Sequence, residues 1–378
     1  MKAETETSFP EPHPHEGWSR EVVRLENATI WPAGKLQRHP VCGVLDKHDK
    51  DVPESAIYRG LTRMMMPAIR KSDSPAKLKG RHIWGGQVFA HFGHFLCESI
   101  ARLWAARLHE ADSIVFIGRH EDLRRFSPWQ ERFLELMDLK LPVQILTEPT
   151  EVEELLVPGQ GFGLGMIARG TPEFRNFMRP LADRVKADGS RRIYISRTHE
   201  GKKGRVLNEL KMERNFEKLG YEIFHPQEHS LEEQLAHYAS ATHIIGLDSS
   251  AFHLCGFVAR PEQKIGIILR RNMLAYYNIQ RQLEGMMGHD PDIINALEGD
   301  WLTEKQKAPG RLSWGQVDHA ELARQMAAAG YIDAPEDWEA PTEAEYEKAL
   351  ANYKKRMRQP LKFVPVETPI HDVMAGRL

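Results

Sequence analysis

Short apolar runs alternate with longer amphipathic stretches between residues 191 and 269 of this 378-residue chain. The apolar runs are residues 193–195, 221–224, 243–247 and 264–269, and each has the length of a buried strand. Ser230 and Glu233 have the spacing of a capping box, which marks the start of a helix between the second and third runs. Strands that alternate with helices of this length predict a parallel sheet covered on both faces.

The first half of the chain shows a less regular alternation. Apolar runs predict strands at residues 29–31, 43–45, 56–59, 114–118, 143–146 and 155–157. Amphipathic patterns predict helices at residues 91–108, 128–139 and 171–187, and the last of these connects the two halves. The basic stretch at residues 70–81 is expected to form an exposed loop. The first half is therefore also predicted to be an α/β structure.

The C-terminal part has a different pattern. Beyond the turn signal at Pro309 and Gly310, residues 317–329 and 342–358 are predicted to be helical. We divide the chain into a flexible lead-in, an N-terminal α/β lobe, a C-terminal Rossmann-like lobe and a helical region that could pack back on the first lobe. The predicted bounds of these four parts are 1–21, 22–180, 181–300 and 301–378.

Composition narrows the functional classes. The chain has 51 basic and 53 acidic residues and a formal net charge of -2, which argues against a nucleic-acid-binding protein. Its 3 cysteines are far apart, so neither a disulfide framework nor a zinc ribbon is indicated. Residues 1–18 lack the features of a signal peptide, and no window reaches the roughly 18 apolar residues of a membrane-spanning helix. We therefore expect a cytoplasmic protein.

Polar residues lie at the ends of the predicted strands in the second half, where parallel sheets bind their ligands. They are Arg197, Lys203, Arg205, Glu228, Asp248, Ser249, Ser250 and His253. The three basic residues could neutralise phosphate oxygens, and Glu228 could accept hydrogen bonds from ribose hydroxyls. Ser249, Ser250 and the amides of a helix start could hold a phosphate, with His253 one turn further on. This set suits an anionic ligand that carries hydroxyl groups.

Each of these residues also has a structural interpretation. A basic loop is often only solvated, and Glu228 could be an ordinary loop residue. Ser250 could cap a helix while His253 makes a hydrogen bond inside the protein. Glu209, at the start of the helix that follows the basic loop, could orient the arginines or simply favour the helix N-terminus. Both interpretations of these residues stay open at this stage.

A second polar group is predicted on the helix at residues 91–108. His94, Glu98 and Arg102 are spaced at i, i+4 and i+8, so they would form one flank of an otherwise apolar helix. A buried carboxylate held between His and Arg is costly unless it is satisfied or used in chemistry. Such a group could also pin the helix to the preceding glycine-containing loop. His91 and His94 have H-x-x-H spacing, but no further ligand run accompanies them, so a metal site is not expected.

Two segments of the chain resemble a known family. The first contains HFGHFLCESIARLWAA within residues 86–106. The second runs from residue 194 to residue 253 and contains YISR, GRVLNE, HSLEEQL and THIIGLDSSAFH. In this order the motifs resemble glycosyltransferase family 61, which includes bacterial capsular-polysaccharide proteins, plant xylan-modifying enzymes and animal N-acetylglucosaminyl enzymes.

The resemblance implies a fold and a reaction. It implies a GT-B architecture, with two Rossmann-like lobes, a cleft between them and C-terminal helices. The C-terminal lobe would bind the nucleotide-sugar donor, the N-terminal lobe would lie on the acceptor side, and the transfer would be inverting. One position departs from the family, because Asp248-Ser249-Ser250 stands where a small glycine-containing turn is frequent. An acidic residue there could bind a ribose or sugar hydroxyl but would repel phosphate.

These features lead to one main functional prediction. We predict a metal-independent hexosyl- or pentosyltransferase with no cofactor, acting on a glycan or lipid-linked glycan acceptor in surface or capsular polysaccharide biosynthesis. Inverting transfer needs a base for the acceptor hydroxyl, and His94 or Glu98 could be that base. The main alternative is a non-catalytic glycan- or nucleotide-binding protein with the same fold. A sugar-nucleotide epimerase or a phosphotransferase was disfavoured because the chain lacks G-x-G-x-x-G and Walker motifs.

A basic segment near the C-terminus allows a membrane contact. Residues 353–363 contain five basic residues beside Met357, Leu361 and Phe363. Weak peripheral docking to the inner face of an anionic membrane would suit a lipid-linked acceptor. The simpler interpretation is a solvated helix face.

Overall fold

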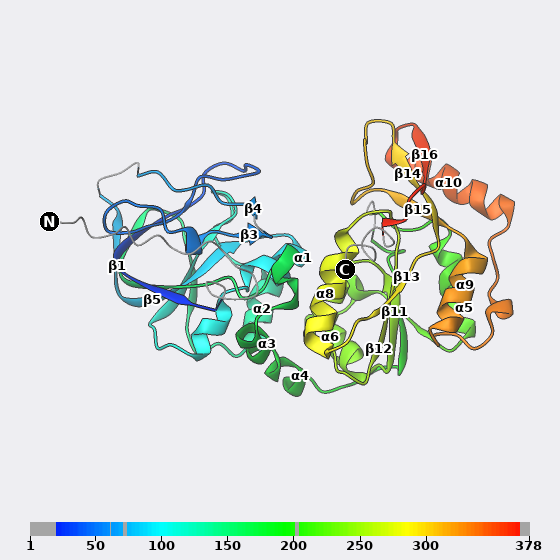
Figure 1. Ribbon diagram of the computed structural model, residues 1–378, viewed down its shortest axis with the longest axis horizontal. Coiled ribbons are helices and arrows are strands. Elements are labelled where there is room, and N and C mark those ends of the chain that lie inside the picture. The colour runs from blue at the N-terminus through cyan, green and yellow to red at the C-terminus, as the bar shows by residue number, and fades with distance from the viewer. Residues whose placement is uncertain (1–19, 61, 71–73, 201–203, 371–378) are drawn as a thin grey trace. The chain divides into compact units, whose positions relative to one another are not determined.

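The computed structural model describes residues 20–60, 62–70, 74–200 and 204–370. The chain divides into two compact units, Met1–Arg184 and Val185–Leu378, which are described separately here (Figure 1). Each unit combines helices with a sheet that contains parallel strands. The protein is therefore a mixed α/β protein.

The first unit is built on a six-stranded mixed sheet of order β2-β1-β8-β5-β6-β7. Its strands are β1 (Val22–Trp31), β2 (Gly43–Leu45), β5 (Ala76–Val88), β6 (Ser113–Gly118), β7 (Val143–Leu146) and β8 (Thr150–Pro158). β1 is antiparallel to both β2 and β8, whereas β8, β5, β6 and β7 run parallel. A short antiparallel pair, β3 (Tyr58–Arg59) and β4 (Thr62–Arg63), lies outside this sheet. All the apolar runs predicted as strands here contribute residues to β1, β2, β3, β6, β7 or β8.

The prediction of an exposed loop at residues 70–81 is wrong for residues 76–81, which begin the central strand β5. Basic residues alternate along this part of β5, and acidic residues of β8 face them. Lys77 Nζ lies 2.5 Å from Glu151 Oε1, and Arg81 Nε lies 2.7 Å from Glu154 Oε1. Cross-strand pairs of opposite charge stabilise a sheet, so charge does not exclude these residues from a strand.

The helix predicted at residues 91–108 is interrupted. It consists of a short helical turn α1 (Phe92–His94), a π-helical turn (Phe95–Ser99) and a 3₁₀ turn (Leu103–Arg107). The π-helical turn ends at Ile100, whose φ of -92° and ψ of 0° are not helical. α2 (Pro128–Leu136) forms close to its predicted place. The helix predicted at residues 171–187 is split into α3 (Pro172–Met178) and α4 (Pro180–Arg184), because Pro180 has no N–H to continue the first helix.

The second unit contains a five-stranded parallel sheet of order β10-β9-β11-β12-β13. Its strands are β9 (Arg192–Ile195), β10 (Glu222–Phe224), β11 (His243–Leu247), β12 (Lys264–Ile268) and β13 (Asp292–Ile294). The four strands predicted here are confirmed as neighbours in one parallel sheet, and β13 was not predicted. The capping box of Ser230 and Glu233 is confirmed at the start of α6.

Helices cover both faces of this sheet (Figure 1). They are α5 (Glu209–Lys218), α6 (Leu231–Ser240), α7 (Ala251–Gly256), α8 (Ala275–Met287) and α9 (His319–Ala328). Residues of α5 and α9 share one apolar cluster with residues of β9, β11 and β12. α7 contacts both α6 and α8. Polar residues follow the carboxyl ends of β9, β11 and β12.

The region after residue 300 contains strands as well as helices, so its prediction as a helical region is only partly correct. The predicted boundary falls inside β14 (Leu297–Thr303), which pairs with β15 (Trp314–Val317) and β16 (Leu361–Pro365) in an antiparallel sheet. α10 (Glu343–Met357) packs Tyr353 on Trp314 and Leu207. A parallel bridge between Val206 and Gly315 connects β15 to the loop after β9. This region therefore forms part of the second unit.

Candidate functional site

Three arginines lie at one edge of the parallel sheet in the second unit. Arg197 follows β9, and Arg270 and Arg271 follow β12, with β11 and its terminal Asp248 between the two strands. Because parallel strands end at the same edge, these residues come together although 73 positions separate the first two in the sequence. We call these three residues the arginine edge.

Asp248 holds two of the arginines in place. Arg270 Nε lies 2.6 Å from Asp248 Oδ1 and donates to the Asp248 backbone oxygen at 2.9 Å. Its N–H points at the backbone oxygen, so the approach to Oδ1 is a close ion contact rather than an aligned hydrogen bond. Arg271 Nε lies 3.4 Å from Asp248 Oδ2. Both carboxylate oxygens thus face guanidinium groups, and Asp248 acts as their counter-charge instead of repelling an anion.

The arginine edge carries an excess of positive charge. Burial, only partly offset by Asp248, lowers the pKa of Arg270 to about 10. The like charges of Arg197 and Arg271 lower this pKa as well, which places the three guanidinium groups within electrostatic reach of one another. Burial also raises the pKa of the neighbouring Asp300 to about 6, so this carboxyl loses its negative charge readily. An anion is the ligand that such a group favours.

Several buried polar atoms at this edge have no hydrogen-bond partner among the described residues. They are Ser249 Oγ, Arg270 Nη1 and Asp300 Oδ1. Buried polar atoms in folded proteins are rarely unpaired, and exceptions often mark a position that a ligand or water completes. The predicted donor residue Ser249 is therefore placed beside the arginine edge with an unused hydroxyl.

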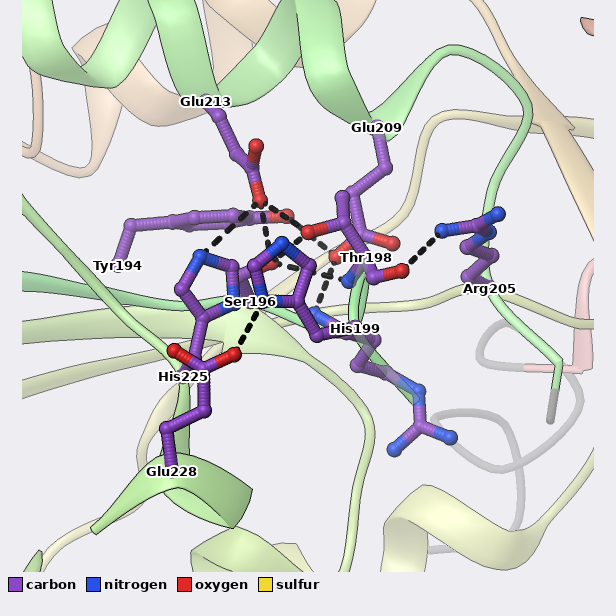
Figure 2. Close-up of polar contacts among 10 residues, drawn as sticks. Tyr194, Ser196, Thr198, His199, Arg205, Glu209, Glu213, His225 and Glu228 are labelled. Carbon is purple, nitrogen blue, oxygen red and sulfur yellow. Dashed lines mark hydrogen bonds and ion pairs between the residues drawn. The ribbon is translucent and has the colours of Figure 1, made fainter. Parts of the chain in front are cut away.

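Two carboxylates of α5 fix the loop after β9 (Figure 2). Ser196 Oγ and Thr198 Oγ1 donate to Glu213 Oε1 at 2.5 and 2.6 Å. The backbone N–H of Arg197 donates to Glu209 Oε1 at 2.7 Å, while its Nε donates to the Gly204 oxygen at 2.9 Å. α5 thus determines how Arg197 is presented. Glu209 was considered for this orienting role from the sequence, and Glu213 was missed although it lies one helical turn further along.

Glu209 is a buried carboxyl with an incomplete set of partners. Burial raises its pKa to about 7, against the opposing hydrogen bond from the Arg197 backbone. Tyr194 donates its hydroxyl to Oε1 at 3.3 Å, and Oε2 has no partner among the described residues. Glu209 can therefore change its charge close to neutral pH.

Arg205 lies against Trp314 and the backbone of Thr198. Its guanidinium carbon lies 4.3 Å from the centre of the Trp314 ring, and Nη1 donates to the Thr198 backbone oxygen at 2.7 Å. Figure 2 shows Arg205 beyond Thr198, on the side away from Glu228. The other predicted basic residue of this loop, Lys203, lies outside the described residues. Arg205 is thus held by Trp314 and Thr198, although the charge of Arg197 still lowers its pKa.

Glu228 lies beyond β10 and pairs with a histidine. Its Oε1 is 2.5 Å from His199 Nδ1, and His199 stacks on His225 with ring centres 3.9 Å apart. The hydrogen bond from His199 lowers the pKa of Glu228. Glu228 is half exposed, so an ionised carboxylate is accessible at this end of β10.

Of the remaining predicted donor residues, His253 fits its structural interpretation, whereas Ser250 does not cap its helix. Ser250 stands at the start of α7 but makes no side-chain capping bond, and α7 is only 6 residues long. His253 Nδ1 lies 2.6 Å from Gln282 Oε1, and Gln282 Nε2 donates back to the His253 backbone oxygen at 2.9 Å. His253 is thus held between α7 and α8 by a mutual pair of contacts.

The first unit brings His94, Glu98 and Arg59 together. Glu98 Oε2 lies 2.7 Å from His94 Nδ1, and Arg59 binds both oxygens of Glu98 at 2.8 and 2.9 Å. The Glu98 side chain is 0% exposed and that of His94 is 36% exposed. Burial alone would raise the pKa of Glu98, but the hydrogen bonds from His94 and Arg59 outweigh it and the pKa is lowered. Glu98 is therefore an ionised acceptor, which argues against its use as the base.

The protonation of His94 follows from these distances. An ionised carboxylate at 2.7 Å requires a proton on Nδ1, so the neutral imidazole would have its lone pair on Nε2. Arg59 Nη2 lies 3.3 Å from the same Nδ1 and is a neighbour rather than a donor to it. His94 can therefore accept a proton at Nε2 while Glu98 stabilises the imidazolium that forms.

The predicted contact between Glu98 and Arg102 is wrong. Arg102 is fully buried and donates to the backbone oxygens of Pro158, Glu54 and Ala56 at 3.0, 2.9 and 2.6 Å. The interruption of the predicted helix after Ser99 turns Arg102 away from the flank of His94. The arginine that binds Glu98 comes instead from β3. The sequence did not indicate this contact. Within the described ranges, no group of three or more His, Cys, Asp or Glu could hold a metal ion.

Comparison with known proteins supports a glycosyltransferase. Residues 92–266 match the family model described as glycosyltransferase 61, and this span includes His94, Glu98, Arg197 and Asp248. The match supports the family that the sequence motifs resemble, and with it a glycosyltransferase activity. None of the curated protein sequences matches this chain.

Among the solved structures that this chain matches is a heptosyltransferase. It is the crystal structure of the dodecameric iron-containing heptosyltransferase TibC in complex with ADP-D-beta-D-heptose. The sequence identity is 10%, the TM-score is 0.29, and the similarity covers 92% of this chain and 99% of that chain. A likeness at this TM-score supports no inference about function. No helix in the described part of this chain is long and apolar enough to cross a membrane.

Proposed function

We propose that the protein is an inverting, metal-independent glycosyltransferase that moves a sugar from a nucleotide-sugar donor to a glycan acceptor. The observation that carries this proposal is the arginine edge, with three guanidinium groups at the carboxyl ends of β9 and β12, on either side of β11 and Asp248. The family match over residues 92–266 supports the same class of reaction. We further propose a cytoplasmic location and a place in surface or capsular polysaccharide biosynthesis, with a GT-B arrangement of the two units.

The arginine edge would bind the diphosphate of the donor. A guanidinium group can bind two phosphate oxygens at once, and burial strengthens the attraction because water screens it less. Asp248 keeps Arg270 and Arg271 in position before the ligand arrives. The unused Ser249 hydroxyl could donate to a phosphate oxygen, and Glu228 could accept from the ribose hydroxyls. Arginines that neutralise the leaving diphosphate would supply the charge that a metal supplies elsewhere.

The first unit would supply the base. In an inverting transfer the acceptor oxygen attacks the sugar carbon as the bond to the diphosphate breaks, and the acceptor proton must be removed. We assign this proton to Nε2 of His94, because Nδ1 is already bound to Glu98. The nucleoside diphosphate leaves with the bonding electron pair. Arg59 is a positioning residue that keeps Glu98 ionised.

A nucleotide-binding experiment tests the donor site. Thermal unfolding measured with nucleoside diphosphates should show stabilisation, about 2.7 kcal/mol for a ligand at a hundred times its dissociation constant. Arg197→Ala and Arg271→Ala should remove this shift. Arg324→Ala is the matched control, because it deletes the same charge from the exposed face of α9. An unchanged shift in both edge variants would contradict the proposed donor site.

A further inference from the structure

A basic pocket lies in the second unit, between the loop after β9 and α10. It has a volume of about 510 Å³ and is lined by Arg205, Trp314, Asn352, Lys355, Arg356 and Arg358. An adjoining cavity of about 250 Å³ shares Arg205, Trp314 and Asn352 with it. Except for Arg205, these residues lie outside the span of the family match. We call this feature the α10 pocket.

The lining of the α10 pocket is cationic. Four of its six residues carry a positive charge and none carries a negative one. Burial lowers the pKa of Arg205, the negative charge of Glu209 opposes this shift, and the like charges of Arg356 and Arg197 lower the pKa further. Cationic side chains that line one cavity attract an anion, because its charge offsets theirs. A phosphate group, with several oxygens that accept charge-assisted hydrogen bonds, suits such a lining.

Two of the four cations, Arg205 and Arg356, lie near an aromatic stack. Tyr353 of α10 stacks on Trp314 with ring centres 4.2 Å apart and an interplanar angle of 13°. Because this face of the indole is covered, Arg205, 4.3 Å from the ring centre, must occupy the other face. Arg356 lies 5.8 Å from the same ring centre. Trp314 is buried, and its Nε1–H has no acceptor among the described residues. The stack thus positions Arg205 and Arg356 at one wall of the pocket, while Lys355 and Arg358 are exposed.

The apolar residues nearby favour a pocket over membrane insertion. Met357 and Leu361 pack inward against the cluster of Leu207, Trp314 and Tyr353. Arg358 ends α10 in a left-handed conformation, with φ of 52°, and turns the chain into β16. Met357 and Leu361 are therefore used inside the fold, whereas Phe363 is 38% exposed, and the basic side chains surround a concave surface. A headgroup could reach this surface without insertion of the protein into the bilayer.

We propose that the α10 pocket binds the phosphate or diphosphate group of a phosphorylated ligand, at a site separate from the arginine edge. This inference goes beyond the proposed function and does not depend on it. The same group occurs in soluble phosphate esters and in lipid headgroups. The experiment below separates these two sources.

The test compares two pairs of substitutions in the same segment. The pocket pair is Lys355→Ala with Arg358→Gly; Lys355 is exposed, and glycine suits the left-handed conformation at residue 358. The control pair is Lys354→Ala with Lys362→Ala, which removes the same charge from exposed residues that do not line the pocket. Circular dichroism and thermal unfolding establish that both pairs are folded.

Isothermal titration calorimetry with inorganic pyrophosphate gives the main result. The pocket pair should weaken binding about tenfold or abolish one of two binding events, and the control pair should leave it within about twofold. Equal effects of both pairs would show diffuse attraction and overturn the proposal. Loss of pyrophosphate binding in Arg271→Ala alone, with the pocket pair unchanged, would also overturn it while leaving the proposed donor site intact.

Vesicle co-sedimentation identifies the source of the phosphate. Vesicles of phosphatidylcholine are compared with vesicles that also contain phosphatidylglycerol. If wild-type protein sediments only with the anionic vesicles and the pocket pair abolishes this, the pocket binds a lipid headgroup. If the protein ignores both vesicles but the pocket pair loses pyrophosphate, the ligand is soluble. If both pairs reduce sedimentation equally and neither affects pyrophosphate, the proposal is wrong.

Discussion

Glu98 in the first unit and Glu209 in the second are both almost completely buried, yet their surroundings change their acidity in opposite directions. Burial favours the neutral form of both, but His94 and Arg59 outweigh it at Glu98, and its pKa is lowered. Among the described residues, Glu209 receives hydrogen bonds from a backbone N–H and a tyrosine hydroxyl, and burial raises its pKa to about 7. The charge of the partners, rather than the depth of burial, decides the charge of each carboxyl.

This difference suits two different tasks. A permanently ionised Glu98 can hold the Nδ1 proton of His94 and stabilise an imidazolium, which a neutral carboxyl could not do. A carboxyl that becomes neutral near pH 7 leaves the neighbouring arginines with more net positive charge. Glu209 can thus take up a proton when an anion enters the arginine edge, while Glu98 keeps its charge. The comparison predicts which substitutions affect turnover and which affect the response to pH.

The largest expected effect concerns the base. His94→Ala should reduce turnover by about 10²–10⁴-fold, because general base catalysis contributes this much, and should leave nucleotide affinity nearly unchanged. Turnover is measured as nucleoside diphosphate release with saturating donor and acceptor. His109→Ala, which changes an exposed histidine of the same unit, is the control. Wild-type turnover in a folded His94→Ala protein would place the base elsewhere. Absence of turnover in the wild-type protein as well would favour the alternative of a non-catalytic binding protein.

Removing the charge of Glu98 should come next. Glu98→Gln leaves Arg59 without its carboxylate, and we expect a loss of about 3 kcal/mol in the free energy of unfolding. This figure is at the low end of such losses, because the Arg59 side chain is 31% exposed. Urea unfolding measures the effect. Arg59→Gln in the same protein should recover part of the loss, since the uncompensated charge is then gone. If the losses of the two single variants simply add in the double variant, the two side chains do not act as a pair.

The arginine edge shows how far the sequence could define the site. The apolar runs predicted four parallel strands correctly, because each strand is buried on both faces and needs no distant information. The strand-end rule found Arg197, Asp248 and Ser249, and it would also have found Arg270 and Arg271 directly after the fourth run. Glu213 could have been found from its i+4 spacing to Glu209. These residues are predictable because local patterns determine them.

Other features depend on contacts that no local pattern contains. β5 was assigned to a loop because its charge balance involves Glu151 and Glu154, more than 70 positions away. Arg59 binds Glu98 from a two-residue strand, 39 positions earlier in the chain. The periodicity of an ideal helix gave Arg102 as the partner, but the π-helical turn before it breaks that periodicity. Tertiary pairing and helix irregularity therefore limit what the sequence predicts.

A pH titration of stability sharpens the comparison at Glu209. A carboxyl whose pKa is raised on folding contributes stability that is complete below its unfolded pKa, near 4.5, and is lost as the pH rises through about 7. We expect Glu209 to account for a decrease of about 2 kcal/mol in the free energy of unfolding between pH 5 and pH 7.5. Glu209→Gln should flatten this decrease, whereas Glu98→Gln should not. An equal slope in wild type and Glu209→Gln would show that Glu209 is not the titrating group.

The smallest expected effect concerns Glu213, which holds the loop that carries Arg197. It tests whether uncharged hydroxyl donors can satisfy this buried carboxylate. Glu213 Oε1 accepts from Ser196 and Thr198, so Thr198→Val removes one of two hydroxyl donors and keeps the shape of the side chain. We expect a loss of about 1 kcal/mol in the free energy of unfolding, because Ser196 still donates. Nucleotide affinity should also weaken slightly, since this loop presents Arg197. Thr242→Val is the control, because its hydroxyl lies at the opposite end of β11, where it donates to the Arg191 backbone oxygen and contacts His243 Nδ1. If Thr198→Val lowers the free energy of unfolding no more than Thr242→Val does, the hydroxyl donors do little to stabilise Glu213. The contrast between charged and uncharged partners would then rest on Glu98 and Glu209 alone.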